Sequence, residues 1–181
     1  MSKNISTARE NILSIACALF YCNGYNSTGF AQIAAQAGVT ETCIYELFGS
    51  KEELCIACLN RRHTYWFNKL IEFIDEAETP KSKMVASFDF LYQMNIEEDF
   101  RGCSFLNIMP EVTVRNQGVL AVIQNHKKEL RDFFKGQLKG QKQYIIDHVY
   151  LLFESAIIES QLFRSQWPVE SSRQLIHSLV K

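Results

Sequence analysis

Apolar residues recur along this chain at spacings of three and four positions, which is the period of an amphipathic helix. Alternating runs of the kind that predict strands are missing. The first apolar stripe consists of Ile12, Ile15, Ala16, Leu19 and Phe20. Thr7 and Glu10 have the spacing of a capping box, so this helix is expected to begin near Thr7 and to end before Gly24.

Two short helices are predicted next, over 30–37 and 41–48. Gly38 ends the first, and Thr40 is placed to cap the second. Ser50 and Glu53 form another capping box, which begins a long helix reaching to about residue 77. Five further helices are expected at 82–97, 103–115 with a kink or break at Pro110, 118–138, 142–165 and 169–180.

The composition is that of a globular all-α protein of about nine helices. A hydrophobic fraction of 47% over 181 residues is enough to form a sizeable core. No apolar run is long enough to span a membrane, and the polar N-terminus does not resemble a secretory signal, so a soluble cytoplasmic protein without membrane association is expected. Its cysteines are then expected to be reduced, and most of them to be small core residues: Cys17, Cys22, Cys43, Cys55, Cys58 and Cys103.

The segment 30–48, FAQIAAQAGVTETCIYELF, has the form of a helix-turn-helix. Ile33 and Ala34 are expected to face inward, and Gly38 permits the turn. Val39, Ile44 and Phe48 would bury the inner face of the second helix. The outward set would then be Thr40, Glu41, Thr42, Tyr45 and Leu47.

From residue 8 to about 54 the chain resembles the TetR/AcrR family of transcriptional regulators. The residues that carry the resemblance are Ile12, Leu13, Ala16, Phe20, Gly24, Tyr25, Thr28, Ile33, Ala34, Ala37, Gly38, Val39, Thr40, Ile44, Tyr45, Phe48, Ser50, Lys51, Glu52 and Leu54. The resemblance implies a helix-turn-helix DNA-binding domain over 1–52 and a helical effector-binding and dimerisation domain over 53–181. It also implies that the second short helix enters the major groove.

The resemblance assigns DNA contacts residue by residue. Thr40, Glu41, Thr42 and Tyr45 occupy positions that touch phosphates or base edges in relatives. Lys51 and Thr28 occupy phosphate-binding positions. Leu47 departs from the family's usual His or Tyr, and Gly29 replaces a frequent hydroxyl residue.

Charge gives little general attraction for nucleic acid. The net charge is −1, and residues 1–55 hold three cationic and five acidic side chains, so weak non-specific DNA binding is expected. Glu41 would accept a hydrogen bond from a cytosine amino group, and Leu47 would pack on a thymine methyl. The alternative is that Glu41 and Glu46 only favour the helix start and solvation.

The two C-terminal helices resemble the family's dimerisation pair, which implies a homodimer on a near-palindromic double-stranded operator. The candidate interface residues are Tyr150, Phe153, Ile157, Ile158, Leu162, Leu175 and Leu179. The candidate pocket for an unidentified small-molecule effector is formed by Trp66, Phe67, Phe88, Tyr92, Phe105, Met109 and Phe153. For both sets the alternative is ordinary intramolecular core.

The function predicted from these features is that of a dimeric DNA-binding regulator, most simply a repressor, that a small-molecule effector releases from its operator. No enzymatic constellation, cofactor motif or metal-ligand spacing is present in the sequence, so neither an enzyme nor a cofactor is expected. Two alternatives remain open. One is a thiol-based redox sensor in which the start of the long helix lowers the pKa of a thiol at Cys55 or Cys58. The other is a helical interaction module that has lost DNA binding.

Overall fold

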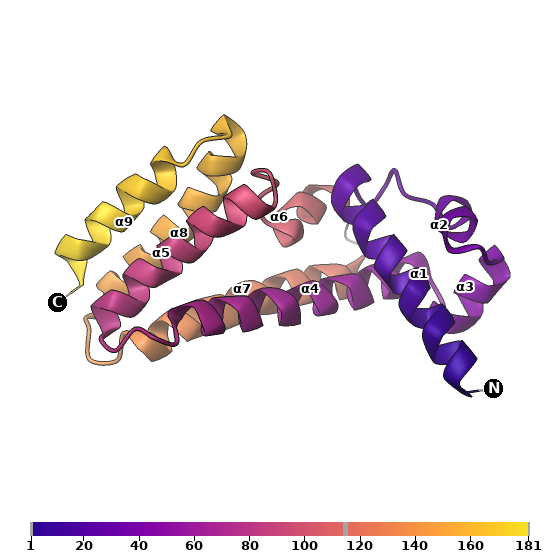
Figure 1. The fold of residues 1–181 in the computed structure, drawn as a ribbon, viewed down its shortest axis with the longest axis horizontal. Coiled ribbons are helices and arrows are strands. Elements are labelled where there is room, and N and C mark those ends of the chain that lie inside the picture. Colours follow the sequence, from indigo (N-terminus) through magenta and orange to yellow (C-terminus); the bar gives the residue numbers. More distant parts are fainter. Residues whose placement is uncertain (1, 114–115, 181) are drawn as a thin grey trace. The chain divides into compact units, whose positions relative to one another are not determined.

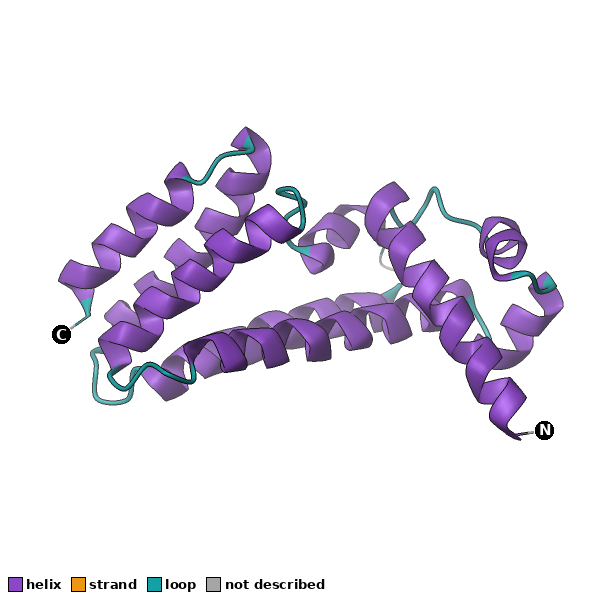
Figure 2. Ribbon diagram, in the orientation of Figure 1, coloured by secondary structure: helices purple, strands orange, loops and turns teal. Residues whose placement is uncertain are grey.

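The computed structural model describes residues 2–113 and 116–180, and all regular structure in these ranges is helical (Figure 2). The α-helices are α1 (Ser2–Asn23), α2 (Phe30–Ala37), α3 (Glu41–Phe48), α4 (Lys51–Ile74), α5 (Pro80–Glu97), α6 (Ser104–Ile108), α7 (Gln117–Gln137), α8 (Gln143–Phe163) and α9 (Trp167–Leu179). One 3-10 turn, η1, covers Met109–Glu111. The all-α fold is therefore confirmed. None of the described helices is long and apolar enough to cross a bilayer.

The chain forms two compact units, labelled by their helices in Figure 1. The first unit contains residues up to 64 together with 104–124, and the second contains 65–103 and the chain from 125 onward. Helices α4 and α7 each begin in the first unit and continue into the second. The grouping of α6 and η1 with the N-terminal helices was not expected from the sequence, and the functional boundary after residue 52 stays a prediction.

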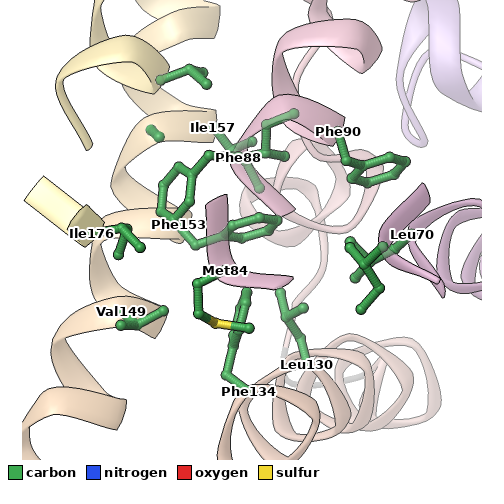
Figure 3. Close-up of a cluster of buried hydrophobic side chains, with 14 of the residues drawn as sticks. Leu70, Met84, Phe88, Phe90, Leu130, Phe134, Val149, Phe153, Ile157 and Ile176 are labelled. Carbon is green, nitrogen blue, oxygen red and sulfur yellow. The ribbon is translucent and has the colours of Figure 1, made fainter. Parts of the chain in front are cut away.

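The second unit is built around α5, α8 and α9, which pack against one another (Figure 1). Its core is rich in aromatic rings, and the ring centroids of Phe88 and Phe134 lie 5.5 and 5.0 Å from that of Phe153 (Figure 3). Edge-to-face pairs of this kind contribute about 1 kcal/mol each beyond the area they bury. The packed rings thus join α5, α7 and α8, and α9 adds the aliphatic side chains of Val169 and Ile176 to the same core.

Two predicted boundaries are wrong. Helix α1 begins at Ser2, five positions before the predicted capping box at Thr7, because residues 2–6 contain no proline or glycine to prevent the helix from extending. The helix expected over 103–115 ends at Ile108 and continues only as η1. Pro110 lacks an N–H and its ring crowds the preceding turn, so the break predicted there is confirmed. Residues 114 and 115 of that prediction lie outside the described residues.

Candidate nucleic-acid interface

Helices α2 and α3 form the helix-turn-helix, and the turn between them depends on two residues. Gly38 adopts a left-handed conformation with φ of +66°, and its N–H donates to the carbonyl of Ala34. The hydroxyl of Thr40 accepts a hydrogen bond from the N–H of Cys43 at 3.2 Å. Both predicted end signals are confirmed, and together they fix where α2 ends and α3 begins.

The two faces of α3 divide as predicted except at Val39, expected to be buried, and Leu47, expected to face outward, because both are half-buried. Ile44 and Phe48 are buried, together with Ile33 and Ala34 of α2. Thr40, Glu41, Thr42 and Tyr45 are exposed, and Leu47 is half-buried. The exposed side chains are therefore held outward by the buried residues on the opposite face of the same helix.

Tyr45 is the largest of these exposed side chains. Its side chain is 55% exposed, yet its ring packs edge-on against Phe30 with centroids 4.6 Å apart. Phe30 is the buried first residue of α2. This contact restricts the tyrosine ring while about half of the side chain stays exposed, which suits a side chain that meets another molecule.

The hydroxyl of Thr28 does not lie where the phosphate prediction needs it. Thr28 is fully buried, and its hydroxyl donates a hydrogen bond to the carbonyl of Gly24 at 2.8 Å. This bond closes the loop before α2. Gly29, the N-cap residue, has no side chain to bind the first N–H groups of α2. Any phosphate contact at this point would therefore use backbone N–H groups.

Lys51 begins α4 and is positioned by the loop before α2. Its ammonium lies 4.5 Å from the centroid of the Tyr25 ring, and it donates to the carbonyl of Asn26 at 3.5 Å. Partial burial lowers the pKa of Lys51 from its ordinary value. The cation is thus held beside the loop that leads into the helix-turn-helix.

Glu111 is a structural residue of this region that the sequence patterns did not identify. Its carboxylate accepts hydrogen bonds from the N–H groups of Tyr25 at 3.1 Å and Asn26 at 2.6 Å. A Cβ on Gly24 would lie 2.6 Å from the same carboxylate. Glu111 therefore fixes the loop between α1 and α2 from a turn 85 residues later, a separation that no local pattern can reveal.

Some of the acidic side chains counted against DNA binding have partners inside the first unit. Glu52 accepts a hydrogen bond from the N–H of Gly118 at 3.2 Å, near the start of α7, and Glu10 pairs with Arg61. Arg9, which the sequence analysis did not single out, stacks its guanidinium 4.7 Å from the ring centroid of Phe48. Two of the five carboxylates therefore have structural partners, whereas Glu41 and Glu46 on α3 itself are exposed.

Cys55 and Cys58 do not have the environment of a reactive thiol pair. Both are buried, and burial raises the pKa of Cys55 to about 12 and raises the pKa of Cys58 as well. The thiol of Cys58 donates to the carbonyl of Leu13 at 3.8 Å. The expectation that the helix start lowers a thiol pKa here is wrong, because desolvation of the thiolate outweighs the helix terminus.

The residues proposed to line an effector pocket are distributed over both units. Trp66, Phe88 and Phe153 are buried in the core of the second unit, and Phe67 packs against them. Tyr92 lies exposed on α5. Phe105 is buried and Met109 is exposed in the first unit. Edge-on contacts link the four clustered rings in a chain from Phe67 through Trp66 and Phe153 to Phe88, which is the packing of an ordinary core.

The proposed dimerisation residues divide by exposure. Phe153 and Ile157 are buried within the second unit, so they offer no surface to a second chain. Tyr150 and Leu179 are half-buried. Ile158, Leu162 and Leu175 are 48%, 68% and 49% exposed. These last three leave an apolar surface on α8 and α9, which pack against each other.

Comparisons with known proteins agree with this geometry. Residues 12–58, which include the whole helix-turn-helix, match the family model described as bacterial regulatory proteins of the tetR family. The HTH-type transcriptional regulator LmrA of Bacillus subtilis is 27% identical over 134 residues, covering 73% of this chain and 71% of LmrA. The chain belongs to the TetR family of DNA-binding transcriptional regulators.

Solved structures extend the likeness of fold to nearly the full length of this TetR-family chain. The regulator SCO4454 of Streptomyces coelicolor superimposes with a TM-score of 0.82 at 24% identity, covering 96% of this chain and 94% of that one. The reduced form of Escherichia coli NemR gives a TM-score of 0.80 at 17% identity, with 97% of each chain covered. At these identities the likeness concerns the fold alone.

Proposed function

We propose that this TetR-family regulator is a homodimeric repressor that binds a near-palindromic operator and is released by a small-molecule effector. The observation that carries the proposal is the outward projection of Thr42 and Tyr45 from a helix whose opposite face is buried. E. coli NemR, which is similar over 95% of this chain, is named a transcriptional repressor. Repression is proposed here on that analogy.

The recognition helix in this proposal is α3, lying in the major groove. Thr42 and Tyr45 contact base edges or phosphates, and Thr40 and Glu41 lie at the N-terminal end of the helix, the end that commonly contacts base edges. Glu41 accepts from a cytosine amino group and Leu47 contacts a thymine methyl with the part of its side chain that is exposed. Lys51 and the N–H groups at the start of α2 bind phosphates.

Dimerisation is proposed through the apolar surface of α8 and α9. Burying the exposed parts of its leucine and isoleucine side chains against a second chain would stabilise the dimer by roughly 25 cal/mol per Å² of apolar area. A two-fold dimer places two copies of α3 about 34 Å apart, the length of one helical turn of DNA. Phe153 and Ile157 are buried within each chain and take no part in the proposed interface.

Release follows if an effector favours a conformation in which the two recognition helices no longer match successive major grooves. Such an effector must bind the released and DNA-bound conformations with affinities that differ by a few kcal/mol. Trp66, Phe88 and Phe153 pack in the core of the second unit, so we propose no effector site between them.

The experiment that tests the proposal is selection of bound fragments from the genomic DNA of the source, followed by gel shifts on the selected site. We expect a near-palindromic site bound by two chains, and loss of the complex on Thr42→Ala and Tyr45→Ala. Ser165→Ala, outside the helix-turn-helix, serves as the control. Absence of any specific complex at low salt would favour the interaction module instead.

A further inference from the structure

Two thiols from different helices meet inside the first unit. Cys17 lies on α1 and Cys58 on α4, and both line a pocket of about 220 Å³ between these helices and α6. Their side chains are joined by a hydrogen bond. The thiol of Cys58 also donates to the carbonyl of Leu13, one helical turn before Cys17. Cys58 is therefore held against the stretch of α1 that carries Cys17.

The two thiols differ in access and in acidity. Cys17 is half-buried, whereas Cys58 is only 5% exposed. The hydrogen bond from Cys58 lowers the pKa of Cys17, an effect that burial opposes and the nearby Arg61 cation strengthens. Burial and the same hydrogen bond raise the pKa of Cys58. Cys17 is therefore the thiol that ionises first and that a small molecule can reach, and Cys58 is a protonated thiol beside it.

We propose that Cys17 and Cys58 form a dithiol site that a hydroperoxide oxidises to a disulfide. The thiolate of Cys17 attacks one oxygen of hydrogen peroxide and becomes a sulfenic acid, while the O–O bond breaks and hydroxide leaves. The hydroxide takes up the proton that Cys17 had released and becomes water. The sulfur of Cys58 then attacks the sulfur of Cys17, and the sulfenic hydroxyl leaves with the Cys58 proton as a second water.

Neither of the neighbouring thiols combines these properties. Cys55, on α4 one turn before Cys58, is buried, and its pKa is raised to about 12, so it stays protonated. Cys22, further along α1, is exposed. A reaction governed by access alone would begin at Cys22, whereas a reaction governed by pairing begins at Cys17. The two cases give different products and can be told apart.

A disulfide at this point acts on the helices that hold the helix-turn-helix. Helix α1 packs against α2, and α4 begins with Lys51, two helical turns before Cys58. A covalent bond brings two sulfur atoms closer than a hydrogen bond does, so the contact between α1 and α4 must adjust. Weaker operator binding by the oxidised protein is the regulatory role that we infer. That role rests on the proposed function, whereas formation of the disulfide does not.

The test is oxidation of the reduced full-length protein with hydrogen peroxide in the absence of DNA, followed by a count of free thiols after denaturation. The chain has six cysteines, and we expect the parent to lose two thiols and to regain both with dithiothreitol. A non-reducing gel should show no cross-link between chains. Six remaining thiols at millimolar peroxide would overturn the proposed site.

Three variants assign the reaction to this pair. Cys17→Ala should lose no thiol, and Cys58→Ala should lose only one, as a sulfenic acid on Cys17 that dimedone labels. Cys22→Ala is the matched control, because it removes the exposed thiol of the same helix and should still lose two. Loss of two thiols in Cys17→Ala or in Cys58→Ala, or of none in Cys22→Ala, would overturn the pairing.

Thermal denaturation shows whether each variant is folded. Alanine replaces a small side chain at Cys17, which is half-buried, so Cys17→Ala should keep a melting temperature close to that of the parent. Cys58 is buried, and its replacement leaves a small cavity. If Cys58→Ala is unfolded, the thiol counts of Cys17→Ala and Cys22→Ala decide the question without it.

The last measurement compares oxidised and reduced protein on operator DNA. We expect roughly tenfold weaker binding after oxidation, which is within the usual range of coupling between two sites. Dithiothreitol should restore the affinity, and Cys17→Ala should not respond to peroxide. Equal operator affinity of the oxidised and reduced parent would overturn the regulatory role. Failure to find any operator would instead contradict the proposed function and leave the thiol result standing.

Discussion

The carboxylate of Glu111 accepts a hydrogen bond from the backbone N–H of Asn26 at 2.6 Å, across 85 positions of the chain. The same group accepts from the N–H of Tyr25, so two loop donors depend on one side chain. Glu111→Ala should therefore destabilise the first unit by about 3 kcal/mol, since both donors lose a charged acceptor. Urea denaturation measures this loss, and faster exchange of the Tyr25 and Asn26 amide protons locates it.

Two companion variants distinguish the hydrogen bonds from simple loss of bulk. Glu111→Gln retains one side-chain oxygen and should recover part of the stability. Gly24→Ala should be destabilising, because Gly24 has a φ of +92° and the added Cβ would lie 2.6 Å from the carboxylate of Glu111. Native amide protection in Glu111→Ala would show that the loop does not depend on this residue.

The helix-turn-helix could be predicted closely from the sequence because its determinants are local. Gly38, Thr40 and the spacing of Ile44 and Phe48 all act within a few positions of one another, and the structure bears out each of them. Glu111 could not be found in this way. Its role depends on the turn at Pro110 and on the folding of 104–124 against the N-terminal helices.

Side-chain burial was the second limit on sequence reasoning. Thr28 has the residue type of a phosphate contact, yet its hydroxyl donates a hydrogen bond to the carbonyl of Gly24 inside the protein. Phe153 and Ile158 lie on the same predicted apolar helix, but only Ile158 reaches the surface. A helix that is apolar on several sides has a hydrophobic pattern that does not reveal which side meets the core.

Tyr45 allows DNA binding and folding to be separated with two substitutions. Tyr45→Phe keeps the edge-on contact with Phe30 and should retain stability, while lowering operator affinity if the hydroxyl binds DNA. Tyr45→Ala should also lose about 1 kcal/mol of stability with the aromatic contact. Thermal denaturation and fluorescence anisotropy on the same samples give the two quantities. Parent-level operator affinity in both variants would remove Tyr45 from the interface.

Lys51 should contribute affinity without contributing sequence specificity. Lys51→Met is expected to weaken binding to specific and non-specific duplexes by a similar factor, because a phosphate contact carries no base information. The slope of log affinity against log salt concentration is negative, and its magnitude should decrease by about 0.9 for each copy of the helix-turn-helix in the complex. Anisotropy titrations at several salt concentrations measure it. A change confined to one sequence would instead indicate a base contact.

Leu162 tests the proposed dimer surface. Its side chain is 68% exposed on α8, so Leu162→Glu should leave each chain folded while it introduces charge into the contact between chains. Analytical ultracentrifugation should show a shift toward the monomer and weaker operator binding. Ile96→Glu, at a 57% exposed position on α5, is the matched control and should remain dimeric. Dimers of equal strength in both variants would place the interface elsewhere.

Lys127 and Glu154 form an ion pair in the second unit that makes stability depend on pH. The ammonium donates to both carboxylate oxygens, at 2.9 and 2.8 Å, and both side chains are largely buried. Burial alone would lower the pKa of Lys127, but the neighbouring Cys103 thiol and Glu154 carboxylate together raise it above 10.5. The folded protein therefore holds this proton more tightly than the unfolded chain does.

The raised pKa of Lys127 determines the pH range in which the ion pair stabilises the fold. The stabilisation is complete below the ordinary lysine pKa and is lost as the pH rises through the higher folded value. Lys127→Met should lower the free energy of unfolding by about 3 kcal/mol at neutral pH, since it leaves a buried carboxylate unpaired. The difference from the parent, measured by urea denaturation, should stay constant from neutral to mildly alkaline pH and shrink only above about 10.5. Lys127→Met with Glu154→Leu should recover most of the loss, because no charge then remains buried. A loss that persists in the double variant would mean that packing, and not charge, accounts for the contribution of Lys127.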